Sequence, residues 1–432
     1  MAIIGMGMTD VIVAGNTGVA DLAGVMIGSN IAHVIALFFF GIGMANSPLI
    51  GRHFGTLNWE GIRKQIHQSA WLSLAGGLLT VLIVYLVARY IHLWNIDTDA
   101  RDIAGKYLLA VIPGTFCLAI FPLFRSTLEA MNEIYLVMKV IVAAFVLNIF
   151  VDYWFVFGGF GMPAMGGVGC GWATSLILTI EAIVLAAYLL LSPKYSHLKL
   201  LYRFPKPDWS RIKPTLLLGL PIGLSILMEM GFFGGIALRM ADIGVTEAGA
   251  HAVAINIAAF IFMLFYSIGQ AVTVRASQYI GRKAWNDARQ TVKLGMASVL
   301  ALSLATCLLT LALRNTLPLL FTQDPEVLAL ASLLLVYAAL FQLFDGIQAV
   351  AMCALRAYKD TAIPSLIQGI AFWGIGMPLG IALPFWSFND QPIGSGGVWL
   401  AFCVALFVSS AILCCRMYWV IFRPSARLHR ER

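Results

Sequence analysis

Five acidic residues stand inside long apolar stretches of this sequence, and their placement could support chemistry. They are Asp10, Asp152, Glu181, Glu229 and Asp345. No Lys or Arg lies deep enough in the same stretches to pair with them. Because a carboxylate at the centre of a bilayer costs at least about 2.5–3.5 kcal/mol, each group must be protonated, bind a cation or face water. Each state describes a proton or sodium site, or a counter-charge for a cationic substrate.

Two of these acids belong to the second half of the chain. Glu229 lies in LSILMEMGFF and Asp345 in LFQLFDGIQ, so they can converge in one helical bundle. Two carboxyl groups in an apolar cavity cannot both ionise cheaply unless a cation binds. Competition between a cation and a cationic substrate for one negative charge is the physical basis of antiport. The alternative is a protonated carboxyl that bonds to a neighbouring helix.

The first half of the chain carries a similar group. Asn148 and Asp152 are four residues apart, so they share one face of a helix. Asp10 is their expected partner for binding a cation and a substrate. Glu181 lies in LTIEAIV and has two open readings: a functional acid, or a helix–helix hydrogen-bond partner through the nearby Thr179.

The composition requires a membrane protein around these acids. Of 432 residues, 60% are hydrophobic and 11% are charged, whereas soluble domains are about 25% charged. The mean hydropathy of +0.87 excludes a soluble globular or disordered chain. The longest polar segment, 192–213, has 22 residues, which leaves no room for a soluble catalytic domain.

Apolar runs predict twelve transmembrane helices, because they are continuous rather than alternating as in a barrel. The expected helices are 1–15, 27–50, 69–92, 103–124, 136–158, 167–191, 214–238, 250–274, 292–313, 326–354, 363–385 and 397–420. The first run is about half a span and carries no basic residue before Asp10, so it is no signal peptide. We expect that a start site is placed too late or that the chain has been shortened.

The basic residues predict the orientation. Alternate loops and the tail hold 23 of the 28 Lys and Arg residues, so the positive-inside rule places these loops and the carboxyl terminus in the cytoplasm. The basic excess is then a topology signal and a contact for anionic lipids. Nucleic-acid binding is not expected.

The chain also resembles itself at an offset of 226 to 227 residues. Matching positions include Asn30 with Asn256, Gly43 with Gly269, Asp97 with Asp324, Leu128 with Leu355, and Trp172 with Trp399. Six spans per half make this a parallel repeat, typical of transporters with two bundles around a central cleft. We therefore expect a six-helix lobe at 1–191, a cytoplasmic linker at 192–213, a second lobe at 214–421 and a basic tail at 422–432.

Other motifs predict no cofactor and no enzyme. The seven cysteines form no C-x-x-C pair and are interpreted as small buried apolar side chains. The glycine run GGVGCG at 166–171 lacks the Gly-Lys-Ser/Thr of a phosphate loop and fits close helix packing. The seven histidines show no metal-binding spacing.

Taken together, these residues resemble the multidrug and toxic compound extrusion (MATE) family, in its bacterial NorM-like branch. The segments that carry the resemblance are MTDVIVAG at 8–15, FVLNIFVDYWFVFG at 145–158, FGMPAMGGVGCG at 160–171, GLPIGLSILME at 219–229 and ALRAYKD at 354–360. The stretch 145–171 is the most specific. The resemblance implies two six-helix lobes, a central cleft, and export driven by a sodium or proton gradient.

The resemblance also assigns residues. It implies that Asp10, Glu229 and Asp345 match the family's acids on the first, seventh and tenth helices, and that Asn148 matches a polar position on the fifth. Asp152 falls where this branch more usually has Asn, which adds a possible proton site and leaves the coupling ion open between Na⁺ and H⁺. Glu181 matches no motif of the family.

The predicted function is a secondary active antiporter of the bacterial inner membrane that exports cationic, amphiphilic drugs and toxins. Its partners would be these small molecules and the lipid bilayer, and we expect a monomer. The alternative is a flippase or exporter of lipid-linked or other amphiphilic metabolites on a related two-lobe fold. A flippase would hold phosphates with basic cavity residues, whereas the charges identified here are acidic.

Overall fold

The computed structural model describes residues 2–94, 97–159, 161–202, 204–388 and 391–423. Regular structure in this part of the chain is helical, apart from two strands of two residues each. The chain forms two compact units, Met1–Gly223 and Leu224–Arg432. The boundary falls inside one long helix, ten residues beyond the end of the expected linker at 213. Most of the basic tail expected at 422–432 lies outside the described residues.

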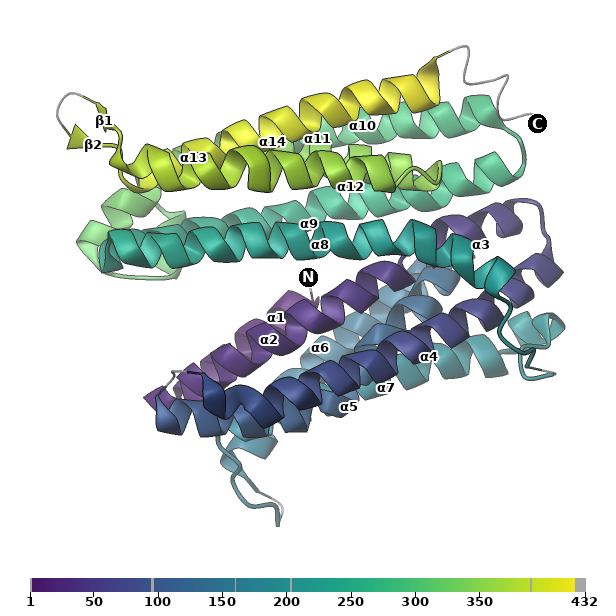
Figure 1. Cartoon of the computed structure of the whole chain (residues 1–432), viewed down its shortest axis with the longest axis horizontal. Helices are drawn as coiled ribbons and strands as arrows, with labels where there is room; N and C mark the ends of the chain where they lie inside the picture. The colour runs from purple at the N-terminus through teal and green to yellow at the C-terminus, as the bar shows by residue number, and fades with distance from the viewer. Residues whose placement is uncertain (1, 95–96, 160, 203, 389–390, 424–432) are drawn as a thin grey trace. The chain divides into compact units, whose positions relative to one another are not determined.

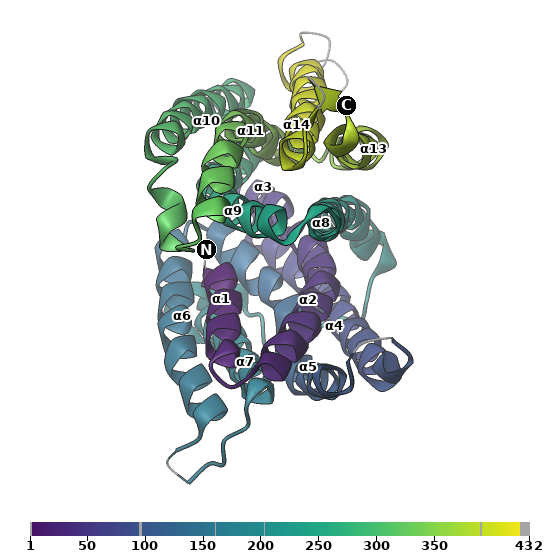
Figure 2. The same cartoon turned by 90° about the vertical axis from the view of Figure 1, so that its left-hand side faces the viewer.

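In the first unit, α5 is the central helix. It packs along α2, α4 and α7, while α1 contacts α2, α6 and α7 (Figures 1 and 2). The helices are α1 (Ala2–Gly15), α2 (Val19–Gly43), α3 (Asn46–Gly55), α4 (Trp59–Tyr90), η1 (Ile91–Leu93), α5 (Thr98–Ala130), α6 (Ile134–Phe157), α7 (Gly167–Leu191), η2 (Pro193–Leu198) and the first part of α8 (Trp209–Ile243).

In the second unit, α11 takes the central position and packs along α9, α10 and α14 (Figure 1). The elements after α8 are α9 (Val245–Gly281), α10 (Trp285–Leu313), η3 (Leu317–Leu320), α11 (Pro325–Ala357), α12 (Ala362–Gly369), η4 (Ile370–Gly376), α13 (Met377–Ala382), η5 (Leu383–Phe385), β1 (Ser387–Phe388), β2 (Gln391–Pro392), α14 (Ser395–Met417) and η6 (Tyr418–Phe422). Phe232, Phe372, Trp399 and Phe402 form an aromatic cluster in its core.

The predicted transmembrane architecture is confirmed. Eleven helical segments among the described residues are long and apolar enough to cross a membrane. The apolar helix α1 adds a twelfth, with 14 residues. This is the architecture of a multi-pass membrane protein.

The predicted helix boundaries were too narrow, because hydropathy marks only the apolar part of a helix. The helix α4 begins at Trp59 rather than at 69, and the Asn58 side chain caps it by accepting a bond of 2.8 Å from the Gly61 N–H. The run at 27–50 is divided between α2 and α3. The run at 363–385 contains a π-helical stretch, η4, between α12 and α13.

The internal repeat extends to the backbone of the turns. Leu57 and Lys283, which are 226 residues apart, both have positive φ angles, 54° and 59°. In both turns the N–H of this residue donates to the carbonyl three residues earlier at 3.0 Å, and the next N–H donates to the carbonyl five residues earlier at 2.9 Å. Asn132 and Lys359 repeat the pattern with φ angles of 68° and 62°.

The N-termini of the central helices also correspond. The Asp97 carboxylate accepts bonds from the second and third N–H groups that follow it, which caps α5. Asp324, 227 residues later, caps α11 in the same way. Because the same turns and caps recur at the same offset, the two halves are built on one helical plan.

The segment 192–213 is bound to the helices at the basic end of the first unit. The His67 ring lies 2.8 Å from the Leu200 carbonyl, and the Gln68 side chain bonds to the Lys206 carbonyl at 3.1 Å and to the Asp208 N–H at 2.8 Å. The expected linker therefore folds against α4.

A second link ties η2 to the turn between α5 and α6. Lys194 forms an ion pair with Glu133, and the Tyr195 hydroxyl donates to the same carboxylate at 2.8 Å. The hydrogen bond and the charge of Lys194, with the Tyr195 hydroxyl, hold the pKa of Glu133 below its ordinary value of 4.5.

Candidate functional site

Asp10 is buried in the first unit, with 1% of its surface exposed. The Tyr107 hydroxyl of α5 donates to its Oδ2 at 3.3 Å. The Thr174 hydroxyl of α7 lies 3.2 Å from Oδ1 and 3.0 Å from Oδ2. Hydroxyls from two other helices therefore fix the orientation of this carboxyl group.

Asp152 and Asn148 are fully buried on one face of α6. Asp152 interacts electrostatically with Asp10 and also contacts Asn148. In the described part of the chain, however, neither Asp152 oxygen and neither polar atom of the Asn148 side-chain amide has a partner with hydrogen-bond geometry. Buried polar groups are nearly always bonded, so four such atoms around one point indicate a place for a ligand.

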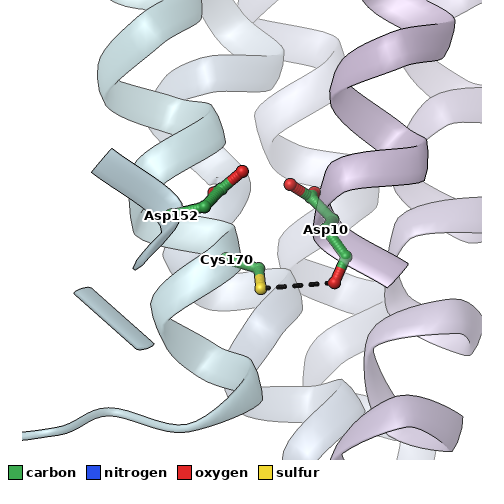
Figure 3. Close-up of side chains that lie close together, drawn as sticks. All are labelled: Asp10, Asp152 and Cys170. Atoms are coloured by element: carbon green, nitrogen blue, oxygen red, sulfur yellow. Dashed lines mark hydrogen bonds between the residues drawn. The ribbon is translucent and has the colours of Figure 1, made fainter. Parts of the chain in front are cut away.

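A thiol completes this group. Ligand atoms of Asp10, Asp152 and Cys170 all lie within 4.8 Å of one another. The two carboxyl groups point toward each other from α1 and α6, and the Cys170 sulfur of α7 lies beside them (Figure 3). The thiol donates to the Asp10 backbone carbonyl at 3.6 Å. The arrangement can bind a cation with oxygen ligands and has one sulfur within reach.

The second unit contains the other acidic pair. Glu229 lies on α8, and the Gln368 side chain of α12 donates to its Oε2 at 3.0 Å. Asp345 lies on α11 with 4% of its surface exposed and interacts electrostatically with Glu229. The structure therefore brings Glu229 and Asp345 together in one unit.

Comparison with known proteins identifies the chain. The family model described as MatE matches residues 1–154 and 221–382, which is most of the sequence. All five residues predicted for the site lie inside the matched ranges: Asp10, Asn148, Asp152, Glu229 and Asp345.

The chain belongs to the MatE family.

Relatives cover this MatE protein over nearly its full length. It is 33% identical to a probable multidrug resistance protein NorM of Shewanella oneidensis over 94% of the chain and 89% of the relative. It is 31% identical to the multidrug resistance protein MdtK of Edwardsiella ictaluri over 98% of the chain and 92% of the relative. The bacterial NorM-like branch predicted from the sequence is confirmed.

Solved structures share the MatE fold. The eukaryotic MATE transporter AtDTX14 superposes with a TM-score of 0.86 at 20% identity, over 100% of this chain and 94% of that one. A transporter of the MOP superfamily from Pyrococcus furiosus superposes with a TM-score of 0.83 at 19% identity, over 98% and 94%. These structures support the fold.

Glu181 lies apart from both acidic pairs of this MatE protein. It is buried on α7 with 1% of its surface exposed, and it interacts electrostatically with Arg125. Its Oε1 has no hydrogen-bond partner among the described residues. The hydroxyl of Thr179 donates to the Ser175 carbonyl at 2.7 Å instead, so Thr179 is not the helix–helix link considered from the sequence.

Four further residues of the MatE site were missed in the sequence: Tyr107, Cys170, Thr174 and Gln368. Cys170 and Thr174 are four residues apart on α7, which places them on one face. That spacing was a readable signal. What the sequence lacked was the position of this face beside Asp10.

Proposed function

We propose that this protein is a cation-coupled antiporter that exports cationic, amphiphilic compounds across the bacterial inner membrane. Its relatives at 31–33% identity are named as multidrug resistance proteins, which supports drug export as the class of function. A transport protein of this kind needs no chemical step, and we infer that the protein is not an enzyme.

One observation carries the proposal: Asp10 and Asp152 face each other in a buried site. Their interactions involve hydroxyls, an amide, a thiol and each other, and include no Lys or Arg among the described residues. Two buried carboxyl groups without a basic partner favour a site that takes up a cation. Binding of Na⁺ or H⁺ there would cancel the charge that attracts a cationic drug.

Glu229 and Asp345 would form a second site of the same kind in the other unit. Gln368 donates to Glu229, which stabilises a negative charge on that carboxylate. A cation and a drug that compete for this charge cannot both remain bound, so arrival of the cation would promote release of the drug.

The basic residues support the orientation. The loops and tail that carry 23 of the 28 Lys and Arg residues would face the cytoplasm, together with the carboxyl terminus. The acidic character of both sites favours cationic cargo over the phosphate-bearing cargo of a lipid flippase. We propose a monomer as the working unit.

The test uses purified protein in liposomes loaded with a fluorescent cationic dye, with sodium and pH gradients imposed separately. Dye movement with sodium alone would identify Na⁺ as the coupling ion, and movement with pH alone would identify H⁺. Glu229→Gln and Asp152→Asn should each abolish gradient-driven movement, whereas Asp102→Asn, at an exposed position of α5, should not. Full gradient-driven efflux by Glu229→Gln would contradict the assignment.

A further inference from the structure

The group formed by Asp10, Asp152 and Cys170 has a donor set that alkali cations do not need. Sodium and protons require only oxygen ligands, which the two carboxyl groups supply. The Cys170 sulfur adds a soft ligand within 4.8 Å of both (Figure 3). Thiolates favour zinc and other soft or borderline metals over hard cations such as Mg²⁺.

The distances in this group fit a transition-metal site after a small closure. Zinc binds sulfur at about 2.3 Å and carboxylate oxygen at about 2.0–2.2 Å, so two ligands on a tetrahedral ion lie about 3.5 Å apart. The ligand atoms here are already within 4.8 Å of one another. Three protein ligands with a fourth position open are typical of zinc sites that exchange a ligand.

The surroundings prepare the group to bind an ion. Asp152 is fully buried, and neither of its oxygens has a hydrogen-bond partner among the described residues. The adjacent Asn148 amide also has none. Thr174 and Tyr107 bond to Asp10, as outer partners that orient a metal ligand do. The site therefore has both unsatisfied ligand atoms and support for the ligands.

A second buried cysteine shows that the carboxyl groups make the difference. Cys403 in α14 donates to the Tyr337 carbonyl at 3.5 Å, much as Cys170 donates to the Asp10 carbonyl at 3.6 Å. Both thiols are buried. Among the described residues, only the group around Cys170 combines three possible metal ligands. Cys403 is therefore a matched control for burial and hydrogen bonding.

We propose that Asp10, Asp152 and Cys170 form a binding site for a thiophilic divalent cation, of the Zn²⁺ and Cd²⁺ class, and that this ion blocks the site of the coupling cation. The blocking role rests on the proposed function of Asp10 and Asp152, whereas binding of the metal does not. When the ion binds, the Cys170 S–H bond breaks, a metal–sulfur bond forms and the proton passes to solvent. The two carboxylates balance the divalent charge.

The binding test uses the purified full-length protein titrated with Cd²⁺ and follows the ultraviolet charge-transfer band of a cadmium–thiolate bond. All samples carry Cys414→Ser and Cys415→Ser, because these neighbouring thiols, one of them exposed, could bind Cd²⁺ by themselves. Cys170→Ser and Asp152→Asn should each weaken binding by at least about tenfold, while Cys403→Ser should bind like the parent. Excess Mg²⁺ should not compete.

Each result decides the inference. Unchanged affinity in Cys170→Ser or in Asp152→Asn would overturn it, as would loss of binding in Cys403→Ser alone. Asp152→Asn provides a second variant if Cys170→Ser does not give a monodisperse protein in size-exclusion chromatography. That substitution removes a ligand charge while it preserves the side-chain shape.

A transport measurement separates the metal site from the proposed function. In liposomes, Cd²⁺ should inhibit gradient-driven dye movement by the parent, and inhibition should weaken at least tenfold in Cys170→Ser when each rate is compared with its own metal-free rate. If Cd²⁺ binds as expected and coupled transport continues undiminished, the metal site stands and the coupling role of Asp10 and Asp152 fails. If transport depends on Asp152 but Cd²⁺ does not bind, the proposed function stands and the metal site is refuted.

Discussion

Gln368 donates a hydrogen bond of 3.0 Å from its side-chain amide to Oε2 of Glu229 and so joins α12 to α8. The bond lies directly before the π-helical stretch η4, which begins at Ile370. π-Helical turns occur frequently at functional sites. The position of this amide is therefore set by an irregular part of its helix, and its donor is available to only one of the two acids known to interact there.

Replacement of Gln368 by Leu should alter coupling through Glu229. A hydrogen bond to a charged group contributes about 1.5–3 kcal/mol, and 1.4 kcal/mol corresponds to a tenfold change in affinity. Without the donor, the carboxylate should hold the coupling cation more tightly and release it more slowly. We expect the cation concentration for half-maximal dye transport to fall about tenfold, with a lower maximal rate.

The control is Gln342→Leu in the same unit. Gln342 is buried and bonds to the Thr310 hydroxyl at 3.1 Å rather than to an acid. This variant should lose stability without the change in cation dependence. An identical effect of both variants on cation dependence would show that Gln368 acts only through packing.

Thr174 should be required for the orientation of Asp10. Thr174→Val keeps the shape of the side chain and removes the hydroxyl, and loss of a buried partner costs about 1–3 kcal/mol. We expect coupled efflux to fall at least tenfold in Thr174→Val and to recover largely in Thr174→Ser. Thr80→Val removes a buried hydroxyl that bonds only to the Gly76 carbonyl at 2.9 Å, so it should leave efflux near the parent value.

Gly219 should tolerate no side chain, because a Cβ atom there would lie 2.5 Å from the Ile42 carbonyl oxygen of α2. We expect Gly219→Ala to destabilise the protein by about 1–3 kcal/mol, as overpacking usually does. Gly234 is an exposed position of the same helix, and a Cβ atom there would have nothing within 4 Å. Gly234→Ala should be neutral or stabilising by up to about 1 kcal/mol, and thermal unfolding in detergent compares the two.

The link between Glu133 and Lys194 should make stability depend on pH. Because the folded protein holds the pKa of Glu133 below 4.5, this group contributes stability above pH 4.5 and loses the contribution as pH falls through its lowered value. Glu133→Gln should therefore lower the unfolding temperature at pH 7, and the difference should vanish toward pH 3. Glu60→Gln breaks an exposed pair with Lys64 on α4 and should change little at either pH; a pH-independent deficit in Glu133→Gln would refute the explanation.

The sequence predicted the helices well because a membrane span must be apolar along its whole length. The ends of the helices were harder to predict, since caps such as Asn58 and turns such as that at Leu57 depend on backbone geometry rather than on hydropathy. The π-helical stretch η4 was also not predictable. It has no signal in the apolar pattern, which continues through it without a break.

The acids of the site were readable because a carboxyl group in an apolar stretch demands an explanation. Their partners were not, since Thr174 and Gln368 are uncharged and cost little wherever they lie. Cys170 was interpreted as an apolar side chain, and it is buried as expected. Only its distance from Asp10 and Asp152 reveals a second property, and distances between helices are absent from the sequence.

The repeated turns at Leu57 and Lys283 show that one ancestral half was copied, yet the acids do not follow the copy. At the same offsets, Asp10 and Asp152 correspond to Ile236 and Leu379, and Asp345 corresponds to Leu118. The two halves therefore inherited a common frame and acquired their charges separately after the duplication. A chimera built from two copies of either half would keep the architecture and lose one kind of ion site, so natural selection could adjust the two sites independently of each other.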